Sequence, residues 1–80
     1  MKQLQYEIVI EQEEDEAAGY SVHCPALSGC FSNGGTVGEA KKNMQEAMEI
    51  YIESLRSHGL PIPEPRKTVH LEQVTLLVPA

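Results

Sequence analysis

The chain has 80 residues, 41% of them apolar, and 12 acidic against 6 basic side chains give it a net charge of −6 with histidines neutral. This length is enough for one small domain, and the acidity argues against an autonomous nucleic-acid binder. No apolar run approaches the roughly 20 residues that span a bilayer, and the N-terminus lacks a signal peptide, so we expect a cytoplasmic protein without a membrane partner.

Three short strands are expected in the first half of the chain. Apolar and polar residues alternate from Leu4 to Ile10, which predicts a strand with one buried face. The same alternation over residues 20–24 predicts a second strand, which Pro25 ends. Residues 30–32 predict a brief third strand. Because the links between them are short, the strands should pair as an antiparallel meander.

An acidic turn joins the first two strands over residues 12–19. Residues 1–40 hold seven acidic side chains and one basic side chain, Lys2, so the negative charge is concentrated in this half. We interpret Glu13, Glu14 and Asp15 as an exposed hairpin tip. Alternatively, these three side chains attract a basic partner protein. Such charges raise the rate of association more than the affinity.

One amphipathic helix is expected over Val37–His58, with Thr36 as N-cap, Glu39 as its capping-box partner and Gly59 just past the end. Its apolar stripe has the helical spacing of three and four: Val37, Ala40, Met44, Ala47, Met48, Tyr51 and Leu55. Ile50 falls outside this stripe. It is either an ordinary exposed apolar residue or part of a partner or subunit contact.

The end of the chain begins with the proline-rich stretch Leu60–Pro65, which should run extended. A nearly continuous apolar run over 69–78 then predicts a final strand, buried on both faces or central in the sheet. The predicted fold is therefore α+β, in the order β-β-β-α-β. A right-handed crossover would place the last strand parallel to the first, in the spatial order 3-2-1-4, with the helix on one face of a small mixed sheet. Two free sheet edges predict a homo-oligomer, either a dimer or a tetramer.

Several motifs occur in a characteristic order along the chain. A strand runs from Tyr20 into Pro25-Ala-Leu-Ser-Gly29-Cys, the turn Gly34-Gly-Thr36 opens a helix that contains Glu39, and Pro61-Ile-Pro follows. This combination resembles the HicB-like antitoxin family over nearly the whole chain, although Gly35 stands where the family usually has Asp.

The resemblance implies a partial RNase H-like fold and binding to HicA, a small toxin that cleaves RNA. Family members often carry a C-terminal DNA-binding segment that represses their own operon. Because the chain ends directly after the expected last strand, we expect a single domain over residues 1–80 without such a segment, and hence no direct contact with nucleic acid.

The link between the second and third strands is a candidate contact surface. Large apolar side chains are usually core, so Leu27 and Phe31 are expected to be buried. Ala26 and Ser28 are then the better candidates for contact with a partner.

Neither catalysis nor metal binding is expected. RNase H-type hydrolysis uses clustered carboxylates that hold two Mg²⁺ ions, whereas the helical glutamates fall mostly on the solvent side and neither the first nor the last strand has an aspartate. His23, Cys24 and Cys30 lack metal-ligand spacing, and both cysteines are expected as packed thiols. We therefore predict no catalytic residue, metal or cofactor.

The sequence thus favours a non-catalytic antitoxin that occludes an RNA-cleaving toxin. Two alternatives stay open: an orphan RNase H-like interaction domain without a toxin partner, and a divalent-metal nuclease. Mg²⁺-dependent cleavage of RNA would separate the nuclease from both binding functions.

Overall fold

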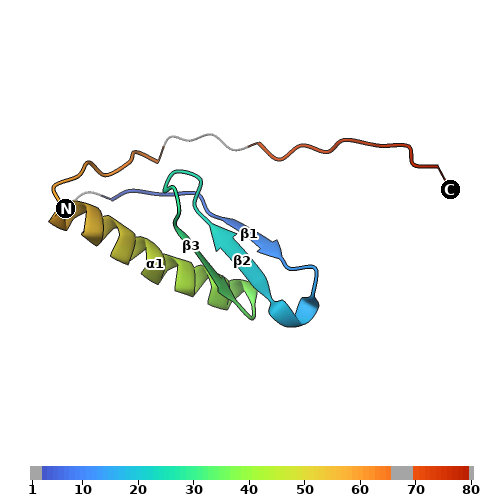
Figure 1. Cartoon of the computed structure of the whole chain (residues 1–80), viewed down its shortest axis with the longest axis horizontal. Helices are drawn as coiled ribbons and strands as arrows, with labels where there is room; N and C mark the ends of the chain where they lie inside the picture. Colours follow the sequence, from blue (N-terminus) through green and yellow to red (C-terminus); the bar gives the residue numbers. More distant parts are fainter. Residues whose placement is uncertain (1–2, 66–69, 80) are drawn as a thin grey trace.

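The computed structural model describes residues 3–65 and 70–79 of the chain (Figure 1). Its elements, in chain order, are strand β1 (Val9–Gln12), 3₁₀-helix η1 (Glu16–Ala18), strands β2 (Tyr20–His23) and β3 (Phe31–Gly34), and helix α1 (Val37–Ser57). The strands form one antiparallel sheet in the order β1-β2-β3, with α1 packed on one face. The predicted α+β class, the meander and the position of the helix are confirmed.

The register of the sheet decides which side chains face the helix. Ile10, Val22 and Ser32 lie side by side across the three strands and turn toward α1, and Val22 is buried there. The neighbouring row consists of Val9, His23 and Phe31 and turns the opposite way, because successive side chains on a strand alternate between faces. We call the side of the sheet away from α1 the open face; its side chains are those of Val9, Glu11, Ser21, His23, Phe31 and Asn33.

The core lies between the sheet and α1. Its buried members are Val22, Cys24, Leu27, Cys30, Ala40 and Met44. Strand β3 and helix α1 approach each other closely at Gly34, where an added Cβ would collide with the backbone N of Ala40. Only glycine fits this contact, which explains why the turn into the helix begins with it.

Both ends of α1 agree with the sequence prediction. The Thr36 hydroxyl accepts a hydrogen bond from the Glu39 backbone N–H at 3.1 Å, which confirms the N-cap. At the other end Gly59 has a φ of +66°, and the Leu60 N–H donates to the Leu55 carbonyl at 2.9 Å. A left-handed glycine of this kind satisfies the last free carbonyls of a helix. The helix ends at Ser57, one residue before the predicted end.

The chain turns back after α1 and runs extended over 60–65, as expected. The Tyr6 hydroxyl donates a hydrogen bond of 2.6 Å to the Pro63 carbonyl, which fixes this stretch beside the N-terminal segment. Burial, and then the nearby Cys24 and Glu64, raise the pKa of Tyr6.

The final strand is the part of the prediction that the structure corrects. Residues 70–79 form no strand with the described residues, their side chains are exposed, and the spatial order 3-2-1-4 is not formed; Val69 lies outside the described residues. The apolar run 71–78 has the composition of a buried strand, but none of the described residues of the sheet or helix buries it. No helix in the described part of the chain is long and apolar enough to cross a bilayer.

Candidate protein-interaction site

The loop between β2 and β3 is compact although it has no regular secondary structure. The Cys24 N–H donates to the Cys30 carbonyl at 3.3 Å, and the Leu27 and Cys30 N–H groups each close a turn within the loop at 3.1 Å. Gly29 has a φ of +78° at the corner of the loop. These bonds fold the loop so that Leu27 is completely buried, which confirms the prediction for this residue.

A side chain of α1 also anchors the loop. The Tyr51 hydroxyl donates to the Ser28 carbonyl at 3.0 Å, so the loop is tied to α1 as well as to the two strands. Ser28 is exposed, as predicted, whereas Ala26 is half-buried and packs against the core. The loop therefore presents a rigid surface.

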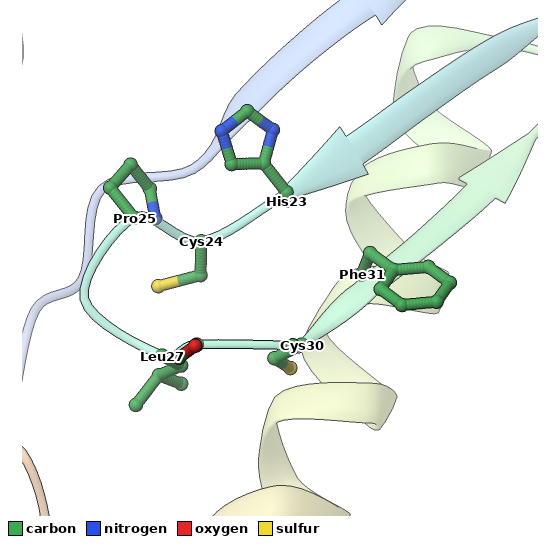
Figure 2. A pocket seen from close by; sticks show the side chains of 8 residues that line it. His23, Cys24, Pro25, Leu27, Cys30 and Phe31 are labelled. Carbon is green, nitrogen blue, oxygen red and sulfur yellow. The ribbon is translucent and has the colours of Figure 1, made fainter.

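Phe31 is not in the core, which contradicts the prediction. It is 73% exposed and lies opposite His23 on the open face, because Cys30 before it points inward and alternation turns Phe31 outward. Figure 2 shows its ring pointing away from Leu27. Phe31 and His23 border an open hollow of about 290 Å³ above the loop. Only the pairing of β2 with β3, which sets Phe31 beside the polar His23, identifies Phe31 as a residue of the open face.

The acidic turn lies at the opposite end of the sheet. Its backbone is closed by a hydrogen bond from the Glu13 N–H to the Gly19 carbonyl at 2.9 Å, and Asp15 Oδ1 accepts from the Ala17 N–H at 3.0 Å to cap η1. The side chains of Glu13, Glu14 and Asp15 are exposed. Neither Lys nor Arg occurs between residues 3 and 40, so this tip and the open face carry acidic charge only.

Ile50 lies on a different surface. It is 71% exposed, as expected, on the side of α1 remote from the sheet, in a shallow hollow with Glu49, Glu53, Ser54 and Ser57. The structure thus divides the predicted contact residues among three places. The loop and the acidic tip lie at the two ends of the sheet, whereas Ile50 lies on the side of α1 remote from the sheet.

The buried thiols are unreactive in character. Cys24 and Cys30 are free and buried, and burial, then the neighbouring Cys24, raise the pKa of Cys30. Burial with a raised pKa, as at Cys30, makes a thiol a poor nucleophile and a poor metal ligand. Within residues 3–65 and 70–79, no group of three His, Cys, Asp or Glu side chains is placed to hold a metal ion.

Comparison with known proteins defines the class to which this fold and surface belong. A family model described as the HicB-like antitoxin of bacterial toxin-antitoxin systems matches residues 6–75. The class is therefore that of antitoxins of toxin-antitoxin systems, and the chain belongs to the HicB-like antitoxin family.

The chain is also similar to individual proteins. The chain is 46% identical to a UPF0150 protein of Synechocystis sp. over 74% of this chain and 72% of that protein. It is 45% identical to a UPF0150 protein of Thermoplasma acidophilum, over 75% and 84%. Among solved structures, a chain of a HicA3 and HicB3 toxin-antitoxin complex superposes with a TM-score of 0.64 at 35% identity, over 79% of this chain and 70% of that chain.

Proposed function

We propose that this antitoxin binds a HicA-like, RNA-cleaving toxin through the open face and blocks access of RNA to it. The observation that carries the proposal is the similarity to a chain of a HicA3 and HicB3 complex, which extends over 79% of this chain. The role is steric and electrostatic, and the protein itself performs no catalysis.

The composition of the open face supports this assignment. Val9 and Phe31 give its loop end an apolar character, and Phe31 is an exposed aromatic residue of the kind enriched in protein interfaces. Glu11 and the acidic tip lie toward the other end of the face. A protein that handles RNA needs a basic surface for the phosphates, and a face with an apolar end and an acidic end complements such a surface.

The contact residues divide by role. Ser28 and Ala26 lie in the rigid loop at one end of the open face. The negative charge at the other end comes from Glu13, Glu14 and Asp15. Ile50, on the side of α1 remote from the sheet, lies outside this contact. We expect the acidic chain to have no sequence-specific affinity for duplex DNA, including its own upstream region.

The decisive experiment measures binding to a purified HicA-like toxin. Phe31→Ala should weaken the complex by roughly 30-fold, the effect of losing a binding hot spot of about 2 kcal/mol. Ile50→Ala is the matched control, because it truncates an equally exposed apolar side chain on the other side of the molecule. Calorimetry on wild type and the two variants gives the ratio of the dissociation constants directly.

Three outcomes would contradict the proposal. The wild-type chain could fail to bind or inhibit the toxin, which would make the antitoxin function wrong. Ile50→Ala could weaken the complex while Phe31→Ala does not, which would move the site to the helix. Mg²⁺-dependent cleavage of RNA by the purified chain alone would favour the nuclease.

A further inference from the structure

The C-terminal run 71–78 exposes apolar side chains that a lone protomer leaves in water. Leu71 is 90% exposed and Leu77 is 98% exposed, and the others resemble them: Val74, Leu76 and Val78. The chain as a whole exposes 6849 Å², roughly 2,000 Å² more than the ~4,800 Å² typical of a compact monomer of this mass. A standard protein interface buries about 800 Å² per partner, so the excess is large enough for a stable interface.

The same chain has an unoccupied place for a strand. β1 pairs with β2 on one side only, and its outer edge is free among the described residues. Helix α1 packs more closely on β3 and β2 than on β1. As a result Ile8 and Ile10, on the helix side of this edge, are only half-buried, and so is Ile52 on α1.

In the observed conformation, residues 71–78 do not reach the free edge of β1 in their own protomer. Residues 60–65 run back along the N-terminal segment in the direction of β1 (Figure 1), and Pro63 is fixed beside Tyr6 by the hydroxyl bond. β1 ends at Gln12, six residues beyond Tyr6. Residues 70–79 lie clear of both sheet and helix (Figure 1), and their side chains are exposed.

The run itself is suited to a sheet edge and not to a basic toxin. Val74, Leu76 and Val78 have the spacing of one strand face, and aliphatic residues of this kind favour strands. Glu72 is the one charged side chain between His70 and Pro79. The segment therefore offers backbone hydrogen bonds and apolar surface but almost no charge complementarity to an RNA-binding protein.

From these observations we infer that two copies of this chain exchange their C-terminal segments, each adding residues 71–78 as a strand to the outer edge of β1 in the other. Because every chain carries both the segment and the edge, the exchange is reciprocal and closes as a two-fold dimer. Strand addition satisfies the free N–H and C=O groups of β1. The row Val74, Leu76 and Val78 then extends the apolar layer beside Ile8 and Ile10. This assembly leaves the open face available.

The test uses the full chain and its mass in solution. Wild type should sediment as a dimer, with slow amide exchange over 71–78 and along β1. Leu76→Asp places a charge in the buried row, so the dissociation constant of the dimer should rise at least about 100-fold and protection over 71–78 should disappear. The domain should stay folded by far-UV circular dichroism, because residue 76 does not contribute to its core. Ile50→Asp is the matched control and should leave the dimer intact.

Each of the remaining outcomes overturns the inference. A monomeric wild type with protected amides over 71–78 would mean that the segment closes on its own sheet. A dimer that survives Leu76→Asp, or one that Ile50→Asp dissociates instead, would place the interface elsewhere. Protection over 71–78 that arises only when the toxin is added would assign the segment to the toxin.

Discussion

The two ends of the small sheet are built on different principles. At one end, the β2–β3 loop buries Cys24, Leu27 and Cys30 and is tied to α1 by Tyr51. At the other end, residues 11–18 have no buried side chain, and the turn is closed by its own backbone and by Asp15. The loop end contributes to the core, whereas the tip end contributes charge.

This division matters for the proposed binding of a toxin. Steering by charge acts over about a Debye length and needs exposure but no packing. Docking needs a rigid surface, which the packed loop supplies beside Phe31. We therefore expect mutations at the loop end to change stability and mutations at the tip to change the rate of association.

The largest effect is expected at Leu27. Leu27→Ala removes a completely buried side chain, and the free energy of unfolding should fall by about 2–5 kcal/mol. Ile50→Ala changes a comparable but exposed side chain and should cost less than about 0.5 kcal/mol. Urea unfolding of both variants checks the difference. Similar losses for the two would show that the loop is not part of the core.

Much of this difference between the two ends was predictable from sequence. The helix boundaries, the Thr36 cap, the buried Leu27 and the exposed tip all follow from local patterns, because period and capping chemistry act within a few residues. Phe31 was mispredicted because hydrophobicity alone does not say which face of a strand a residue occupies. The register with His23 decides that, and register is a property of two strands.

The final segment shows the same limit more strongly. The apolar run over 69–78 predicts a buried strand, but residues 70–79 form no strand and are exposed. Burial requires a neighbouring edge within reach, and residues 70–79 lie clear of the edge of β1 (Figure 1). No pattern within the segment contains that information. The contact residues were likewise predicted one by one, and only the fold shows that Ile50 is on a separate surface from the loop and the tip.

A substitution at Gly34 tests whether the sheet is loosely packed everywhere near the acidic tip. Its position on β3, next to the turn into α1, leaves no room for a Cβ against the backbone of Ala40, so Gly34→Ala should destabilise the domain by about 1–3 kcal/mol. Gly38→Ala, in the first turn of the helix, meets only open space and should stabilise it by up to about 1 kcal/mol. Thermal unfolding should show shifts of opposite sign. Equal shifts would mean that the close strand–helix contact is unimportant.

A substitution at Tyr51 tests whether α1 holds the loop between β2 and β3 in place. Tyr51→Phe removes the hydrogen bond to the Ser28 carbonyl and should cost about 0.5–1.5 kcal/mol. Amide exchange at Leu27 and Cys30, whose N–H groups close the loop, should accelerate. Tyr6→Phe is a matched control, since it removes a comparable bond to Pro63 and should leave those two amides unchanged. Equal exchange in both variants would show that α1 does not hold the loop.

The smallest effect on stability, and the most specific effect on function, is expected at the tip. Neutralising it by Glu13→Gln, Glu14→Gln and Asp15→Asn should change the free energy of unfolding by less than about 0.5 kcal/mol, because all three side chains are exposed. Asparagine at position 15 keeps an oxygen that can accept the bond from the Ala17 N–H. If the proposed toxin binds as described, its association should slow and the salt dependence of that rate should flatten, while dissociation changes little.

A matched triple variant separates local steering from net charge. Glu46→Gln, Glu49→Gln and Glu53→Gln make the same change in charge on exposed positions of α1, remote from the open face. Stopped-flow kinetics over a salt series should show a clearly smaller effect for this variant, because its charges lie farther from the docking surface than the tip does and are screened over about 8–10 Å at ordinary salt. Equal slowing by both triples would mean that total charge alone drives the encounter. If the tip variant keeps the wild-type rate and salt slope, the tip only solubilises the protein, and the functional difference between the two ends of the sheet disappears.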